Sequence, residues 1–211
     1  MKILFISLGC DKNLADSEEM LGLLTANGHE IVDSEEEADA IVINTCCFIH
    51  DAKEESVNTI LEMAEYKKSG TCKALIVTGC MAQRYKEEIT QEIPEVDAVL
   101  GTTSYGDIVK ALNEVQAGNV FQEFRDINEL PEDCGHRVIT TGGHFGYLKI
   151  AEGCDKHCTY CIIPSLRGKF RSVPEERLLR QAEYMASQGV RELILVAQET
   201  TVYGTGLYGK K

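Results

Sequence analysis

Residues 40–46 read AIVINTC, and this short apolar run decides the fold. Comparable runs stand at residues 3–7, 74–78 and 96–100, and each is followed by a segment with helical spacing. Strands that alternate with helices indicate βαβ units and a parallel sheet. The sequence therefore predicts a doubly wound α/β domain at the front of the chain.

The helical segments are marked by the spacing of their apolar residues. In the first of them Met20, Leu21 and Leu24 share one face, and Gly28 stands just past the expected end. We expect helices at residues 15–26, 51–68, 81–92 and 105–116.

A second α/β unit follows a polar connector. Residues 117–140 include the acidic, proline-bearing run NELPEDCG, which is typical of a linker. Beyond it we expect strands at 146–151 and 192–197, with a helix between them that starts near Pro174. The predicted organisation is a front domain over residues 1–125, a linker over 126–139 and an incomplete second domain over 140–211.

Composition narrows the class of protein. The chain has 211 residues, 44% of them hydrophobic, and no run approaches the length of a membrane span. Its nine cysteines are an odd, scattered set, which favours cytosolic metal or thiol chemistry over a disulfide framework. Residues 1–133 carry 27 acidic against 10 basic side chains, a net charge of −17. That charge argues against a nucleic-acid surface and suits a basic protein partner or simple solubility.

Three cysteines stand close together in the loop GCDKHCTYC: Cys154, Cys158 and Cys161. An iron–sulfur cluster normally takes four thiolates, so three leave one iron with an open position where chemistry can occur. The alternative is a zinc site, which needs a fourth ligand. His157 lies in the loop, but its neighbour Cys158 competes for the same space.

A second set of cysteines follows three of the predicted strands: Cys10, Cys46 and Cys80. The carboxyl ends of parallel strands meet at one edge of a sheet, where ligands bind, so these thiols should converge. A second cluster is the functional interpretation, and ordinary buried cysteines near strand ends are the alternative. Adjacent side chains point apart in an extended segment, so only one of Cys46 and Cys47 should reach the cluster. Cys72 and Cys134 are interpreted as incidental.

The two cysteine sets resemble those of the radical S-adenosylmethionine (SAM) methylthiotransferases, over essentially the whole chain. The local motifs resemble one branch, the enzymes that modify an aspartate of the twelfth small-subunit ribosomal protein. The matching runs are SLGCDKN (7–13), DSE (16–18), NTCCFI (44–49), AKEES (52–56), GC (79–80), QRY (83–85), PSLRGKFR (164–171) and AQETTVYG (197–204).

The resemblance implies two 4Fe-4S clusters and SAM as cofactors. The implied metal ligands are Cys10, Cys46 and Cys80 for one cluster and the three loop cysteines for the other. Tyr160 and Gln198 are expected near SAM, and no side chain is assigned a catalytic role. The implied reaction is methylthiolation of the aspartate β-carbon. It needs a SAM-derived radical, because the C–H bond of this carbon has no acidic proton that a general base could remove. The implied partners are the small-subunit ribosomal protein and a reducing electron donor, and the implied location is the cytoplasm. Binding to a membrane or directly to nucleic acid is not expected.

Two alternatives stay open at this point. A tRNA adenosine methylthiotransferase would share both clusters but typically has Gln-Met where this chain has Asp11-Lys12, and it would need a basic surface. An iron–sulfur carrier, or an inactive fragment, would bind clusters without cleaving SAM. The family also continues through further β/α units and a small β-barrel, so we expect this chain to be a fragment that cleaves SAM slowly. Arg167, Lys169 and Arg171 are expected either to meet carboxylates of the cofactor or substrate or to form a solvated basic face.

Overall fold

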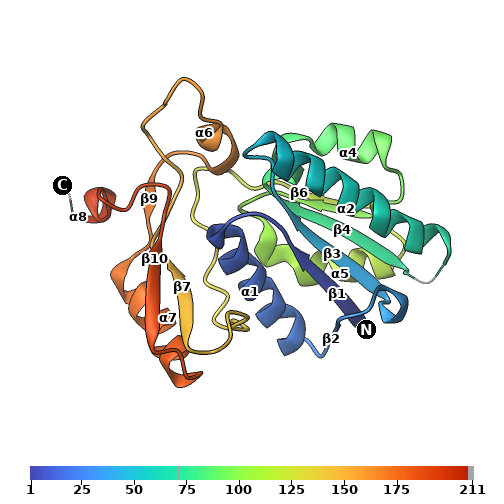
Figure 1. Cartoon of the computed structure of the whole chain (residues 1–211), viewed down its shortest axis with the longest axis horizontal. Helices are drawn as coiled ribbons and strands as arrows, with labels where there is room; N and C mark the ends of the chain where they lie inside the picture. Colours follow the sequence, from blue (N-terminus) through green and yellow to red (C-terminus); the bar gives the residue numbers. More distant parts are fainter. Residues whose placement is uncertain (71, 209–211) are drawn as a thin grey trace.

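The computed structural model describes residues 1–70 and 72–208 (Figure 1). The last three residues of the expected second domain, 209–211, lie outside this described part. Most of the front part of the chain is one six-stranded parallel sheet with the strand order β2-β1-β3-β4-β5-β6. Its strands are β1 (Lys2–Ser7), β2 (Glu30–Val32), β3 (Ala40–Thr45), β4 (Ala74–Gly79), β5 (Ala98–Leu100) and β6 (Phe121–Glu123).

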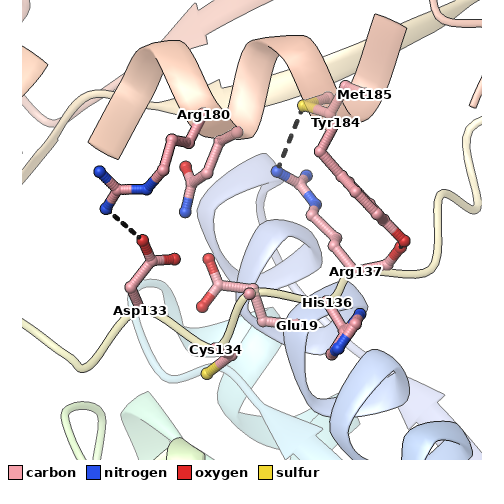
Figure 2. Close-up of a pocket in the computed structure, with 10 residues that line it drawn as sticks. Glu19, Asp133, Cys134, His136, Arg137, Arg180, Tyr184 and Met185 are labelled. Atoms are coloured by element: carbon pink, nitrogen blue, oxygen red, sulfur yellow. Dashed lines mark hydrogen bonds and ion pairs between the residues drawn. The ribbon is translucent and has the colours of Figure 1, made fainter. Parts of the chain in front are cut away.

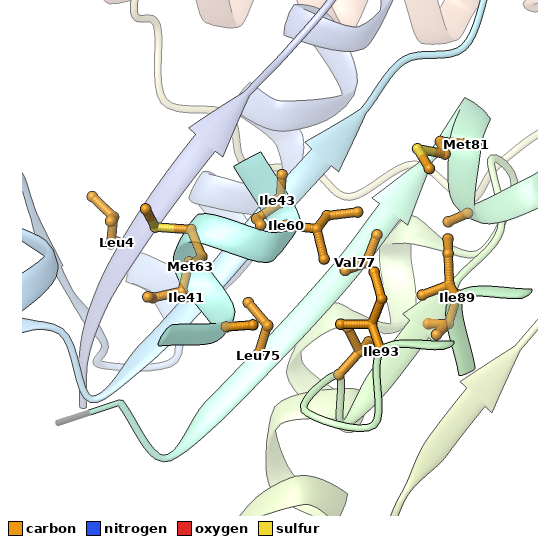
Figure 3. Packing of buried hydrophobic residues seen from close by; sticks show 14 of the residues in the cluster. Leu4, Ile41, Ile43, Ile60, Met63, Leu75, Val77, Met81, Ile89 and Ile93 are labelled. Atoms are coloured by element: carbon orange, nitrogen blue, oxygen red, sulfur yellow. The ribbon is translucent and has the colours of Figure 1, made fainter. Parts of the chain in front are cut away.

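Helices cover both faces of this sheet, as a doubly wound fold requires. Side chains alternate along a strand, so β3 sends Ile41 and Ile43 to one face and Val42 to the other. The first face packs against α2 through residues such as Ile60 and Met63, as Figure 3 shows. The helices of this part are α1 (Asp11–Ala26), α2 (His50–Lys68), α3 (Cys80–Arg84), α4 (Lys86–Glu92) and α5 (Ile108–Gln116). Residues of α1 and α5 belong to the core cluster on the opposite face.

The second part of the chain is smaller and has its own apolar cluster. Strand β7 (Phe145–Lys149) pairs in parallel with β10 (Glu192–Val196), and β8 (Ala151–Glu152) pairs antiparallel with β9 (Arg171–Ser172). Leu148, Ile150 and Met185 are among the buried residues of this cluster. The helices here are α6 (Ile163–Arg167), α7 (Glu175–Ser187) and α8 (Thr205–Tyr208).

The structure corrects four details of the predicted elements. The helix expected at 81–92 is two helices, because Tyr85 leaves the helical conformation (φ −121°, ψ 36°) and stands as the cap residue between α3 and α4. The connector expected at 117–140 contains β6, which pairs with β5. The strand expected at 146–151 is divided into β7 and β8. The three-residue strand β2 was not predicted, because so short a run carries no clear periodicity.

Among the described residues, no helix combines the length and the apolar character that a bilayer crossing requires.

Candidate metal and cofactor site

The strand order of the sheet reverses between β1 and β3, and ligands of parallel α/β sheets bind beside such a reversal, outside the carboxyl ends of the strands. Cys10 follows β1 and precedes the first residue of α1, and Cys46 follows β3 directly. Cys80 follows β4 and is the first residue of α3. All three side chains line one cavity of about 620 Å³.

A tight turn precedes two of these cysteines. Gly9 has φ 93° and Gly79 has φ 92°, a region that glycine adopts without the strain of a side chain. A Cβ atom on Gly79 would also lie 2.3 Å from Asn44 Oδ1 and 2.5 Å from the Thr45 carbonyl oxygen. Glycine therefore allows the chain to turn directly from the strand into the helix that begins with Cys80.

Asn13 ties the ends of the strands together. Its Nδ2 donates to the Leu8 carbonyl at 3.0 Å and to the Thr45 carbonyl at 2.9 Å, so one amide fixes the segments after β1 and β3. Its Oδ1 accepts a hydrogen bond from Arg167 Nη2 at 2.6 Å and lies 3.8 Å from Cys80 Sγ. The sequence carries no signal of this role for Asn13 beyond its place in the run SLGCDKN.

The structure separates Cys46 from Cys47. Cys46 lines the cavity, whereas Cys47 packs in the apolar core and its Sγ lies 3.3 Å from the Cys80 carbonyl oxygen. Burial, together with the neighbouring thiols, raises the pKa of Cys47 to about 12. Cys72 is also buried, with Sγ 3.1 Å from the Ala74 carbonyl oxygen, and does not line the cavity. The geometry thus brings one member of the adjacent pair to the cavity.

The three loop cysteines line the same cavity. The Cys154 amide donates to the Gly168 carbonyl at 3.1 Å, and the Cys161 amide donates to the Cys158 carbonyl at 2.9 Å. Cys158 is exposed and the other two are half-buried. His157 is not among the residues that line the cavity. The second part of the chain therefore brings its whole cysteine set to the cavity that the set of the front part lines.

Six thiols that line one cavity suit an iron–sulfur group, because soft thiolate ligands select iron–sulfur clusters or zinc. The cavity has the size of a small-molecule site and is lined largely by apolar side chains, including Phe48, Ile49, Ile163 and Leu166. Over residues 1–70 and 72–208, however, no three His, Cys, Asp or Glu side chains stand close enough to form a ready-made metal site. The assignment of the six cysteines as ligands therefore stays a prediction.

The two residues expected near SAM are placed differently. Gln198 lines the cavity, and neither its Nε2 nor its Oε1 has a hydrogen-bond partner among the described groups, although both atoms are buried. Buried polar atoms of this kind normally have a partner, so the Gln198 amide is available to a bound molecule. Tyr160 is 90% exposed and does not line the cavity. The structure thus brings Gln198, but not Tyr160, to the site.

A buried ionic network stands behind the cavity wall. Arg167 is 3% exposed, and its Nη1 lies 2.8 Å from Asp16 Oδ2 and 3.4 Å from Glu152 Oε1. Lys149 pairs with the same two carboxylates. Asp16 belongs to α1 and the other three residues to the second part of the chain, so the network joins the two parts. A solvated basic face is therefore wrong for Arg167, and the carboxylates that it meets in the structure are those of the protein itself rather than of a cofactor or substrate.

The network also affects the ionisation of its members. Burial acts to raise the pKa of Glu152, but Lys149 and Arg167 outweigh it and lower that pKa to about 2. Burial raises the pKa of the Cys80 thiol, against the effect of the Arg167 guanidinium beside it. Of the other two basic residues, Arg171 is half-buried and donates to the Arg167 carbonyl at 2.9 Å, and Lys169 is exposed.

A smaller cavity of about 130 Å³ lies between α1, α7 and the segment around Cys134 (Figure 2). Arg180 pairs with Asp133 there at 3.0 Å. Burial raises the pKa of Cys134 to about 12, and it also raises the pKa of Glu19. None of the predicted site residues lines this cavity, so we assign the chemistry to the larger one.

Comparison with known families agrees with this arrangement of two parts. Residues 2–101 match the family described as Uncharacterized protein family UPF0004, and residues 148–208 match the Radical SAM superfamily. The first match covers the strand-end cysteines and the second covers the cysteine loop. Members of the Radical SAM superfamily use SAM and an iron–sulfur cluster, which fits the thiols of that loop.

Curated relatives match the whole chain. The ribosomal protein uS12 methylthiotransferase RimO of Lachnoclostridium phytofermentans is 66% identical over 211 residues, which are 100% of this chain and 48% of the relative. The enzymes of the same name from Clostridioides difficile and Acetivibrio thermocellus are each 50% identical, again over 100% of this chain and 48% of the relative. Over its whole length the chain is thus similar to radical SAM methylthiotransferases of the RimO type. It spans about half the length of the curated relatives it matches.

Proposed function

We propose that this chain takes part in the methylthiolation of ribosomal protein uS12, at the β-carbon of an aspartate, by radical SAM chemistry. The observation that carries the proposal is that both cysteine sets line one cavity, although they lie far apart in the sequence. The relatives named above support uS12 as the substrate. A reducing electron donor is a further expected partner.

The cofactors of the proposal are two 4Fe-4S clusters and SAM. Cys10, Cys46 and Cys80 would hold the first cluster, and the second would be held by Cys154, Cys158 and Cys161. Three thiolates leave one iron of each cluster free for another ligand. Gln198 would contact SAM, because its buried amide lines the same cavity without a partner in the described structure.

The bound cofactors would supply a radical that removes hydrogen from an unactivated carbon, which no side-chain base can deprotonate. The residues of the chain would bind and orient. Apolar side chains such as Phe48, Ile163 and Leu166 line the cavity and would limit the access of water once the cofactors are bound. Asn13 and Arg167 fix its walls relative to one another, which keeps the two cysteine sets at a constant separation.

We further propose that the two cysteine sets belong to different domains, over residues 1–125 and 140–211, with 126–139 as the connection. The last strand of the large sheet ends at Glu123 and the first strand of the second part begins at Phe145, which supports this division. The connection is packed rather than loose, because Arg137 is 6% exposed and pairs with Glu18 at 2.6 Å.

The test is anaerobic reconstitution followed by iron and sulfide analysis, with two triple cysteine-to-alanine variants. The unchanged chain should hold about eight irons, and each triple variant should hold about half as many. With SAM and dithionite, replacement of Cys154, Cys158 and Cys161 should abolish the formation of 5′-deoxyadenosine, whereas replacement of the strand-end set should not.

The matched control is the double variant Cys72→Ala, Cys134→Ala. It removes two thiols that do not line the cavity, and it should leave the iron content unchanged. The assignment fails if either triple variant keeps the full iron content, or if the control variant loses as much iron as a triple variant.

A further inference from the structure

Four of the residues that line the large cavity carry a charge: Lys12, Lys156, Arg167 and Glu199. Three of them are already paired. Lys156 Nζ lies 2.5 Å from Glu199 Oε2, and Arg167 belongs to the buried network described above. Within the described part of the chain, the Lys12 ammonium group makes neither an ion pair nor a hydrogen bond. Lys12 is therefore the one charged group of this cavity that is available to a bound molecule.

The backbone of Lys12 is held in place by its neighbours, whereas its ammonium group has no partner within the described part of the chain. It is the second residue of α1, directly between Asp11 and Asn13, and the Asn13 amide makes a part-buried hydrogen bond to Leu8 and a buried one to Thr45. The side chain is half-buried. A cation in the first turn of a helix is electrostatically unfavourable, because that end of the helix carries partial positive charge. The stability of α1 therefore gives no reason for a lysine here.

An aspartate side chain that enters this cavity leaves water for a largely apolar surrounding. An ionised carboxylate loses much of its hydration there, and it needs a counter-charge or hydrogen-bond donors in return. The lysine ammonium offers both, with one positive charge and three N–H donors. The carboxylate carbon of aspartate is bonded directly to the β-carbon, so holding the carboxylate also fixes the carbon that reacts.

We propose that Lys12 binds the side-chain carboxylate of the target aspartate. This inference rests on the proposed function and deepens it by naming the residue that distinguishes an aspartate from its uncharged analogues. SAM also carries a carboxylate, so the experiment must separate the two sources of this group.

The test is a double-mutant cycle measured by biolayer interferometry. Purified uS12 and its variant with asparagine at the target position are each bound to the reconstituted chain and to Lys12→Met. The unchanged chain should prefer aspartate over asparagine by about tenfold to a hundredfold, the effect of one charged hydrogen-bonded pair. Lys12→Met should lose this preference, and Lys12→Arg should keep most of it.

Lys53→Met is the matched control. Lys53 lies on α2 next to the cavity-lining Ala52 but does not itself line the large cavity, and the substitution removes the same charge. This variant should keep the preference for aspartate. Equal iron content in all variants would show that they fold and bind clusters alike.

Each other outcome has a defined meaning. An undiminished preference in Lys12→Met overturns the assignment of Lys12 and leaves the proposed function in place. If Lys12→Met weakens the binding of SAM in equilibrium dialysis while the aspartate preference persists, Lys12 serves the cofactor and the inference is wrong. If uS12 binds none of the chains, the proposed function itself is contradicted, and the inference with it.

Discussion

Arg167→Met should lower the free energy of unfolding by about 3–5 kcal/mol, because it breaks a buried ionic network by removing one member. The network contains two carboxylates, Asp16 and Glu152, and two cations, Arg167 and Lys149, so its formal charges balance. All four side chains are at most 7% exposed. Without the guanidinium, two buried carboxylates share one ammonium group, and one negative charge remains uncompensated. Since small domains are stable by only about 5–15 kcal/mol, the loss is a large fraction of the total.

The same substitution should change how stability depends on pH. The pKa of Glu152 is lowered from its ordinary value of 4.5 to about 2 in the folded chain. A carboxyl whose pKa is lower in the folded state stabilises the fold above its unfolded pKa, and this contribution is lost as the pH falls from about 4.5 through 2. The difference corresponds to about 3 kcal/mol. Removing Arg167 raises the folded pKa of Glu152, so this contribution should be smaller and should be lost at a higher pH.

The assay is urea unfolding followed by circular dichroism at pH 7 and at steps down to the acid limit of the folded state. Arg125→Met is the matched control, because Arg125 pairs with Asp107 and Glu132, each at 2.9 Å, but its side chain is 33% exposed. Such a pair is worth at most about 1 kcal/mol. The reasoning is refuted if the two arginine variants lose equal stability, or if Arg167→Met leaves the acid dependence unchanged.

Four further substitutions test the structure around the cavity. Cys46→Ala should remove about half of the iron that the reconstituted chain holds. Cys47→Ala should keep the iron but lower the melting temperature, because Cys47 packs in the core. The reverse result would exchange the roles of the two cysteines. Gly79→Ala should destabilise the chain by more than about 1 kcal/mol in urea unfolding, because φ is 92° and the new Cβ would meet Asn44 Oδ1 at 2.3 Å. A neutral effect would contradict the geometry of this turn. Asn13→Ala should cost about 1–3 kcal/mol in the same assay, because the buried Thr45 carbonyl and the part-buried Leu8 carbonyl lose their donor. A loss below about 0.5 kcal/mol would mean that these hydrogen bonds contribute little.

The sequence by itself determined the parallel sheet and the edge at which ligands bind. Apolar runs that alternate with helical spacing depend on local geometry, so the pattern that predicts β3 and α2 can be recognised without knowledge of the rest of the chain. The same local logic placed Cys10, Cys46 and Cys80 at the ends of strands. The spacing of the loop cysteines is local as well. The strands, the helices and the cysteine spacing therefore depend only on residues that are close together in the sequence.

How the two parts of the chain meet cannot be read from the sequence, because it depends on contacts between distant segments. Residues 151 positions apart, Asp16 and Arg167, form a buried ion pair, and no periodicity in either segment indicates such a partner. Long-range contacts also placed Gln198 in the cavity and left Tyr160 on the surface, although both were expected near SAM. The physical reason is that the packing of distant segments sets burial and charge pairing, whereas spacing along the chain specifies only which side chains share a face.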